Sequence, residues 1–253
     1  MIDLHAHILY GVDDGSRNLK ESLQMVRMAA ESGVRAIAVT PHCNIPGFYE
    51  NYDSSELRRR FRELESAVRE EGIPLKLYPG MEVFGRENLN KLLREHKLIP
   101  INDGRYLLIE FDFEEAPDWM SFLLETVREA GLCPLVAHPE RYGAVQADPD
   151  LAYQWVLQGC ALQVNKGSIL GRFGRREQHT AELLLDHELA ACVASDAHHS
   201  AFRTPHMSDT AANLEEFYGR ECVQLLLKDN PERILNSEDI VLLEPRGFRK
   251  KWF

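Results

Sequence analysis

The chain has 253 residues, of which 44% are apolar and 27% are charged, and its formal net charge is −11. These proportions are typical of a soluble globular protein that is large enough to bury a substantial core. The negative charge excludes a generic binder of nucleic acid or of anionic membranes, because both need a basic face. It leaves room for a phosphorylated substrate, since bound cations can reverse the charge of a local site.

Five cysteines stand far apart, without a C-x-x-C pair: Cys43, Cys133, Cys160, Cys192 and Cys222. Cys133 and Cys192 lie in apolar runs, where a free thiol behaves as a small hydrophobe, and this suits a reducing compartment. The N-terminus has no basic-then-apolar signal region, and no apolar run approaches ~18 residues. We therefore expect a cytoplasmic protein without membrane insertion.

Seven short runs have the length and apolar content of buried strands. In chain order they cover residues 2–7, 35–40, 75–82, 106–111, 133–138, 161–165 and 190–196. Segments with helical periodicity stand between and after them, over residues 19–32, 53–69, 86–95, 117–130, 148–157, 175–187, 209–228 and 231–235. Asp53 or Ser54 can cap the second helix, Pro117 opens the fourth, and Gly33 follows the end of the first.

This alternation predicts βα repeats around a parallel sheet, which is an α/β fold. No linker rich in Gly, Pro or Ser divides the repeats, so we expect a single domain over residues 1–253, as is common for α/β barrels of this length. Residues 239–253 are expected to form a polar tail. Its aromatic end, Trp252-Phe253, either docks on the body or stays free.

Polar side chains gather at the carboxyl ends of the predicted strands, where α/β barrels place their reactive groups. Six of the seven strands carry a His, Asp or Glu there: His5, His7, Asp13 and Asp14 after the first, then His42, Glu82, Glu110, His138 with Glu140, and finally Asp196, His198 and His199. One such residue is usually structural. Six coincidences at the same end of the barrel indicate a shared site.

The mixture of imidazoles and carboxylates indicates a metal site. Buried carboxylates need partners to stay charged, and metal ions supply them. Four imidazoles and at least three carboxylates are enough for two or three divalent ions, and the mixture favours Mn, Fe or Zn over a structural zinc site. Clustered ions with open positions are suited to phosphoryl transfer.

Two arginines follow the predicted ligands. Arg141 stands three residues after His138, and Arg203 stands five residues after His198. Arginine is the natural bidentate clamp for a phosphate group. The alternative for either residue alone is a surface salt bridge.

These residues together resemble the ordered motifs of the PHP (polymerase and histidinol phosphatase) superfamily. The opening MIDLHAHILYGVDDGS, the stretch HPERY and the stretch SDAH are most similar to the bacterial PHP-type protein-tyrosine phosphatases, which accompany capsule and exopolysaccharide assembly. The resemblance covers nearly the full length, including NPERIL near the end.

The resemblance implies a distorted (β/α)7 TIM-like barrel with three divalent ions, typically Mn²⁺, with Fe or Zn as alternatives. One ion would be held by His5, His7, Glu82 and Asp196, a second by Asp14, His42 and His198, and a third by Glu82, Glu110 and His138. Asp14, not Asp13, is the position that matches the family. Arg141 and Arg203 would grip the phosphoryl group.

The implied reaction is attack of a metal-bridging hydroxide on phosphorus, in line with the leaving phenolate. Because the pKa of tyrosine is near 10, a strong general acid is not essential. His199 or His206 can still donate a proton. The family often has Asn where His199 stands, so the role of that position is open.

The resemblance also implies a substrate, which is a phosphotyrosine-bearing tail of a bacterial tyrosine kinase that controls polysaccharide synthesis. The loops 43–51 and 168–174 are expected to form a shallow pocket for it, in which Phe48, Tyr49 and Tyr52 either stack on the substrate ring or pack the loop. A cysteine-dependent phosphatase is excluded, because its C-x5-R loop is absent: no cysteine has Arg six positions later.

Three alternatives remain at this stage. The nearest is a PHP phosphatase of a small ester such as histidinol phosphate, which would use the same metals. A nuclease or polymerase-associated module is disfavoured by the acidic chain. A non-catalytic metal-binding scaffold is disfavoured by the complete ligand set and both arginines.

Overall fold

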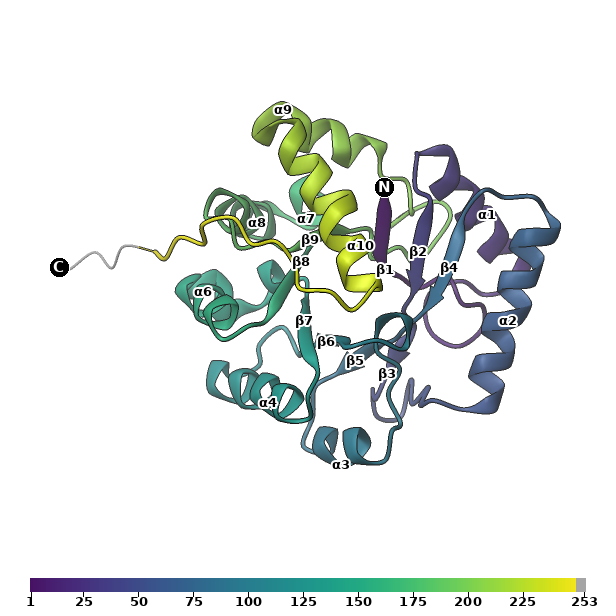
Figure 1. Ribbon diagram of the computed structural model, residues 1–253, viewed down its shortest axis with the longest axis horizontal. Coiled ribbons are helices and arrows are strands. Elements are labelled where there is room, and N and C mark those ends of the chain that lie inside the picture. Colours follow the sequence, from purple (N-terminus) through teal and green to yellow (C-terminus); the bar gives the residue numbers. More distant parts are fainter. Residues whose placement is uncertain (249–253) are drawn as a thin grey trace.

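All strand pairs run parallel within residues 1–248, the part of the chain that the computed structural model describes. The strands are β1 (Ile2–Ala6), β2 (Ala36–Val39), β3 (His42–Cys43), β4 (Lys76–Pro79), β5 (Glu82–Phe84), β6 (Tyr106–Glu110), β7 (Cys133–Ala137), β8 (Ala161–Asn165) and β9 (Cys192–Ala194). They form two sheets, β1-β2-β4 and β3-β5-β6-β7-β8-β9. Figure 1 shows them at the centre, with helices around them.

The two sheets join into one barrel. On one side, β2 continues into β3 and β4 into β5 after short breaks. On the other, Ala6 bridges to Ala197, so that the first strand meets the segment after the last. The predicted α/β barrel is confirmed, and seven positions around the ring correspond to the seven predicted strands.

The predicted strand 75–82 is interrupted after Pro79 and resumes as β5, and the strand predicted over 35–40 ends at Val39 and is followed, after a break at Pro41, by β3. Pro41 has no N–H for a ladder hydrogen bond, and the second strand breaks there. At Gly80 an added Cβ would lie 3.0 Å from Ile101 Cδ1, so this break brings the backbone close to its neighbour. Both breaks redirect the chain just before His42 and Glu82.

The helices are α1 (Leu19–Glu31), α2 (Ser55–Glu70), α3 (Leu89–Arg94), α4 (Pro117–Glu129), α5 (Gly143–Ala147), α6 (Asp150–Leu157), α7 (Lys166–Ile169), α8 (Arg175–Asp186), α9 (Ser208–Gln224) and α10 (Asn230–Leu235). Ser54 caps α2, accepting from Leu57 N at 3.2 Å. The predicted helix 86–95 is shorter than expected, and the helix predicted to reach residue 228 ends its α-helical part at Gln224 and continues as a π-helix over Leu225–Asp229. The sequence analysis missed α5 and α7.

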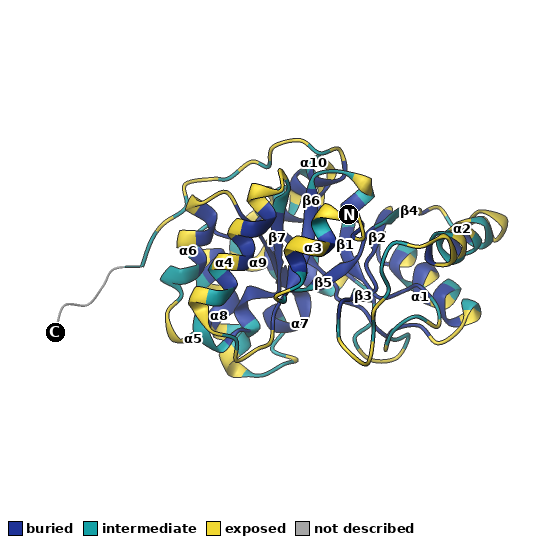
Figure 2. Cartoon of the chain, turned by 90° about the horizontal axis from the view of Figure 1, so that it is seen from below, coloured by how far each residue is buried: buried dark blue, intermediate teal, exposed yellow. Residues whose placement is uncertain are grey.

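Apolar side chains fill the space between strands and helices, whose outer faces are exposed (Figure 2). A second apolar cluster lies lower in the barrel and includes Leu108, Leu135 and Ala161. Leu108 and Glu110 are two residues apart on β6 and therefore share one face of the strand. This face is apolar toward the second cluster and acidic toward the carboxyl end. Ile234 and Leu235 of α10 pack on this cluster and close that end of the barrel.

The segment that follows α10 runs along the body of the protein. Asn230 Nδ2 donates to Val241 O at 2.9 Å, and Phe248 stacks on His187 with ring centroids 3.8 Å apart. The predicted polar tail therefore starts as an irregular segment that contacts the barrel. Its predicted aromatic end, Trp252-Phe253, lies outside the described residues. No helix in residues 1–248 has the length and apolar content needed to cross a membrane.

A buried lysine donates hydrogen bonds to the backbone of the loop that follows β9. Lys166 Nζ donates to the backbone oxygens of Thr204 and His206, the latter at 2.7 Å. Burial lowers the pKa of Lys166 from its ordinary 10.5 to about 8, although the negative charge of Asp3 opposes the shift. Below this pKa the fold must hold a charged ammonium that has lost most of its hydration.

We expect the free energy of unfolding to depend on this group at alkaline pH. Because the folded-state pKa lies below the unfolded one, the cost of the charged form disappears as the pH rises from about 8 to 10.5. Relative to Lys166→Met, the natural chain should gain up to about 3 kcal/mol over this range, at ~1.4 kcal/mol per pKa unit. Urea unfolding of both proteins at several pH values measures it, and a pH-independent difference would contradict it.

Candidate metal centre

The centre is built on β1, whose alternate side chains share a face. His5 and His7 are fully buried, and their Nε2 atoms lie 3.1 Å apart. The outer ring nitrogens are occupied: His5 Nδ1 lies 2.8 Å from Gln163 Oε1, and His7 Nδ1 lies 2.8 Å from Asp13 Oδ2. These acceptors place the ring hydrogens on Nδ1, so two Nε2 lone pairs face each other. Such a pair is stable only with a cation between or beside the two atoms.

Glu82, at the start of β5, lies at the centre of the cluster and is fully buried. Its Oε1 is 3.1 Å from His5 Nε2 and 2.9 Å from His138 Nε2. Its Oε2 is 3.2 Å from His7 Nε2 and 3.1 Å from His42 Nδ1. One carboxylate therefore contacts four imidazoles that come from three parts of the chain: the first strand, β3 and the end of β7.

Three further acidic residues surround this core. Glu110 Oε1 lies 2.8 Å from His42 Nδ1. Asp196 Oδ1 lies 3.5 Å from His7 Nε2. Asp14, whose side chain is 51% exposed, approaches His42 Nε2 at 3.5 Å and His198 Nε2 at 3.6 Å, and it marks the side of the cluster that is open to solvent.

The donor atoms fall into three groups in which all potential ligands lie within 4.8 Å of one another. The groups are His7, Asp14, His42 and His198; His5, His7 and Asp196; and His42, Glu82 and Glu110. Several of these atoms are buried without a hydrogen-bond partner, namely His42 Nδ1, Glu82 Oε2, Glu110 Oε1 and His198 Nε2. Buried polar atoms are normally paired, so this donor set fits divalent cations.

The pKa values of the histidines also indicate that the cluster favours added positive charge. Burial alone would lower the pKa of His5, but the carboxylates of Glu82 and Asp196 raise it to about 9. At His42, Glu82 and Glu110 overcome burial and raise the pKa to about 12. Burial and the charge of His7 lower the pKa of His198 to about 2. The carboxylates thus favour positive charge at His5 and His42, which bound cations would also supply, whereas the surroundings of His198 favour the neutral form that a ligand needs.

Two predicted ligands lie in the left-handed region of the backbone, with φ of 35° at His138 and 49° at Asp196. Residues other than glycine rarely adopt this conformation, which costs roughly 1–3 kcal/mol. Each stands directly after or near the end of its strand, at the point where the chain turns toward the site. Such strain persists where surrounding contacts fix it.

Both predicted arginines lie at the edge of the cluster beside Asp196. Arg203 Nη2 is 2.6 Å and Arg141 Nη1 is 3.7 Å from the same oxygen, Asp196 Oδ2. Oδ1 faces His5, His7 and His198 instead. This single carboxylate therefore separates a metal-binding side from a side that carries two guanidinium groups.

Comparisons with known proteins show the family to which the chain belongs. The family described as "Capsular polysaccharide synthesis, CpsB/CapC" matches residues 1–236. The chain is 34% identical to the tyrosine-protein phosphatase YwqE of Bacillus subtilis, over 99% of this chain and 98% of the relative. It is 28% identical to the tyrosine-protein phosphatase CpsB of Streptococcus pneumoniae, over 94% and 99% respectively.

The chain belongs to the CpsB/CapC family. A crystal structure described under YwqE from Bacillus subtilis and CpsB from Streptococcus pneumoniae, "unique metal-dependent tyrosine phosphatases", superimposes with a TM-score of 0.91 at 34% identity, over 99% of this chain and 100% of that one. The phosphotriesterase of Mycobacterium tuberculosis shares only the fold, with a TM-score of 0.61 at 11% identity. The family predicted from the sequence is confirmed.

As a CpsB/CapC member, the chain brings all nine predicted ligands and both arginines to one end of the barrel, but His199 lies apart from them. Its Nδ1 accepts from Ala201 N at 2.9 Å, and its Nε2 lies 3.2 Å from Glu21 Oε1 of α1. Its ring also stacks on Phe202. His199 therefore belongs to the rim, and its role in proton transfer stays a prediction.

Three polar residues hold the predicted ligands in place, and these supporting roles were not predicted from the sequence. Asp13 accepts from the backbone N of His42 at 3.0 Å as well as contacting His7. Asn165 Nδ2 donates to Asp196 Oδ2 at 2.6 Å, and Glu140 Oε1 accepts from Asn165 N at 3.0 Å. Asn165 stands at the one predicted strand end without His, Asp or Glu, and that position was the available signal.

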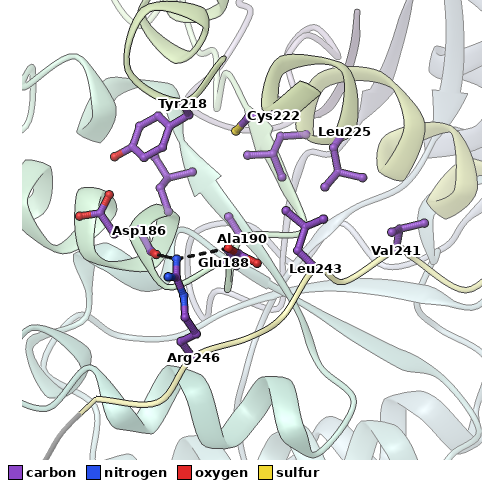
Figure 3. Close-up of a pocket in the computed structure, with 11 residues that line it drawn as sticks. Asp186, Glu188, Ala190, Tyr218, Cys222, Leu225, Val241, Leu243 and Arg246 are labelled. Carbon is purple, nitrogen blue, oxygen red and sulfur yellow. Dashed lines mark hydrogen bonds and ion pairs between the residues drawn. The ribbon is translucent and has the colours of Figure 1, made fainter. Parts of the chain in front are cut away.

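A separate concavity of about 250 Å³ lies between α8, α9 and the segment after α10 (Figure 3). Its wall includes Tyr218, Cys222, Leu225 and Leu243, and Arg246 crosses it to reach Glu188 at 3.2 Å. Ala190, which precedes β9, also lines it, so it lies toward the amino end of that strand. The ligand cluster instead lies at the carboxyl ends of the strands, where its donor set makes it the candidate metal centre.

Asp13 gives a test of this arrangement. Replacing Asp13 with Ala removes the acceptor that fixes the ring of His7, and we expect Mn²⁺ affinity to fall about 10- to 100-fold. Titration calorimetry with Mn²⁺ on the metal-free protein measures the change. Glu216→Ala, an exposed carboxylate of α9, is the matched control and should bind as the natural chain does. Equal affinity in all three proteins would show that Asp13 does not support the centre.

Proposed function

We propose that this chain is a metal-dependent protein-tyrosine phosphatase that hydrolyses phosphotyrosine in a protein of a capsule or exopolysaccharide system. The activity class predicted from the sequence is confirmed by its family and by its YwqE relative. One observation carries the chemistry: four imidazoles, three of them buried, surround Glu82, and two arginines lie at the edge of the same cluster.

We assign the ligands as the sequence resemblance implies. One ion takes His5, His7, Glu82 and Asp196, a second takes Asp14, His42 and His198, and a third takes Glu82, Glu110 and His138. Glu82 lies within 3.2 Å of His5, His7 and His138, which supports its place in two of these ligand sets. Nitrogen and oxygen donors without thiolate support Mn²⁺, with Fe or Zn as alternatives.

When bound, the ions supply Lewis acidity toward phosphate oxygens and toward water. The chain's own contribution is orientation. Gln163 and Asp13 hold His5 and His7 with Nε2 toward the cluster. Arg141 and Arg203 present guanidinium groups beside Asp196, where a phosphoryl group entering from the Asp14 side would meet them.

A cysteine nucleophile is disfavoured by burial as well as by sequence. Burial raises the pKa of Cys160 to about 12 and that of Cys222 to about 11, and it raises the pKa values of Cys43 and Cys192 further. A nucleophilic thiol needs the opposite shift, because only the thiolate attacks phosphorus. Cys43 Sγ instead faces Glu50 O at 3.4 Å.

The partner we propose is a phosphotyrosine-bearing protein, namely the tail of a bacterial tyrosine kinase that controls polysaccharide synthesis. An extended segment needs an open site, and the rim supports this. Phe48 is 78% exposed, and Tyr49 stacks on His42 with centroids 5.8 Å apart and 9° between ring planes. Tyr52 instead packs inward and donates to Asn44 Oδ1 at 3.1 Å, which supports a structural role for that ring.

Activity should require metal and not thiols. We expect a chelator to abolish turnover of p-nitrophenyl phosphate, and added Mn²⁺ to restore it. The Lewis acidity that the reaction needs is supplied by the bound cations and by no side chain of the cluster. Iodoacetamide should leave the rate unchanged. Loss of activity after thiol alkylation, with activity retained in chelator, would overturn the proposal.

Substrate preference separates a tyrosine phosphatase from a phosphatase of small esters. We expect kcat/KM on a phosphotyrosyl peptide to exceed that on histidinol phosphate, because a phenolate leaves more readily than an alkoxide and the open rim admits a peptide. The same Mn²⁺-loaded protein is assayed on both. A higher kcat/KM on histidinol phosphate would favour the small-ester alternative.

A further inference from the structure

We propose that Phe173 is a positioning residue that holds both arginines in place to receive the phosphoryl group. This inference rests on the proposed function, because it concerns the same site. Phe173 lies between α7 and α8, in the loop that follows β8, and it has no polar atom that could react. Its position relative to Arg141 and Arg203 carries the argument.

The Phe173 ring lies within cation–π range of both guanidinium groups. Arg141 Cζ is 4.7 Å from the ring centroid, and Arg203 Cζ is 5.9 Å from it. Phe113 contacts only one of the two, since Arg141 Cζ lies 4.3 Å from its centroid. Among the cation–π contacts of the described residues, Phe173 is therefore the ring shared by two arginines that come from different loops.

The shared ring reduces the repulsion between the two guanidinium groups. Arg141 and Arg203 bring two positive charges to one oxygen, Asp196 Oδ2, which carries less than one negative charge and also accepts from Asn165. The negative face of an aromatic ring offsets part of this excess charge without accepting a hydrogen bond. The guanidinium N–H groups that do not face Asp196 thus remain available to a phosphate group.

The ring itself is fixed from behind by Gly167 of α7. An added Cβ at Gly167 would lie 2.5 Å from Phe173 Cε2 and 2.7 Å from Cζ, so the ring packs against the bare backbone. Gly167 N in turn donates to Asn165 Oδ1 at 2.8 Å. The end of β8 therefore sets the place of the ring, and the ring sets the place of the arginines.

This arrangement predicts a specific effect of Phe173→Leu, which keeps an apolar side chain and removes the aromatic face. KM for a phosphotyrosyl peptide and the Ki of inorganic phosphate should rise ~5- to 30-fold, as two weakened cation–π contacts imply, while kcat changes less. Bound Mn²⁺ and the unfolding midpoint should stay as in the natural chain. Phe173→Tyr and Phe173→Trp should restore phosphate affinity.

Gly167→Ala gives a second and independent test, because it displaces the ring while leaving every aromatic atom present. It should raise the Ki of phosphate in the same direction as Phe173→Leu. Phe113→Leu should have a smaller effect, and Phe122→Leu, an exposed phenylalanine of α4, should have none. In an Arg141→Lys background, Phe173→Leu should cost less than it does alone.

The outcomes separate this inference from the proposed function. If the Mn²⁺-loaded natural chain neither turns over p-nitrophenyl phosphate nor binds phosphate, the proposed function fails. If the natural chain is active and Arg141→Lys weakens phosphate binding, but Phe173→Leu and Gly167→Ala both bind phosphate normally, only the positioning role fails. A Phe173→Leu protein that loses Mn²⁺ or unfolds earlier would show a structural role and would also overturn the inference.

Discussion

The meeting of the first and last strands is the constraint on which the site depends. His7 N donates to Ala197 O at 2.8 Å, and Asp196 N donates to His5 O at 2.8 Å. These two backbone bonds bring residues almost 200 positions apart into one ladder and place two imidazoles against a carboxylate and a third imidazole. Ser195 N adds a bond to Asp3 Oδ1 at 2.9 Å. Without this closure the ring would be an open sheet, and no group of ligands that includes His5 would be complete.

The apolar and polar requirements of the fold are divided along the barrel axis. Below the site, Leu108 and Ala161 fill the interior, and α10 closes it. Above them, the same strands carry Glu110 and Gln163, whose burial is tolerated only because each faces a polar partner or a ligand group. The apolar core fixes the strands that carry the cluster. The cluster in turn holds charged groups that an apolar interior could not accommodate.

Much of this division was predictable from the sequence, because strand ends and ligand types are local features. Four of the predicted ligands follow or end an apolar run, namely His5, His7, Glu82 and Asp196. Such positions come together because the carboxyl ends of all barrel strands meet at one end of the barrel. The proline at position 41 is visible in the sequence. The direction in which the chain turns there depends on the neighbouring strand, which the local sequence does not show. Gln163 and Phe173 could not be assigned, since their partners lie far away in sequence: His5 is 158 residues from Gln163, and the contact between Phe173 and two separate loops has no periodic signature. Asp13 was set aside in favour of Asp14, whereas the structure uses both, one behind His7 and one toward solvent.

The two oxygens of Asp196 have a thermodynamic consequence. Oδ1 faces the imidazoles, and Oδ2 faces the arginines, so charge added on either side changes the field on the other. Binding equilibria coupled through a shared group are reciprocal: the factor by which one ligand changes the affinity of the second equals the factor in the opposite direction. Under the proposed function, cation loading and phosphate capture would therefore be a single linked equilibrium, and an affinity for either would have meaning only at a stated concentration of the other.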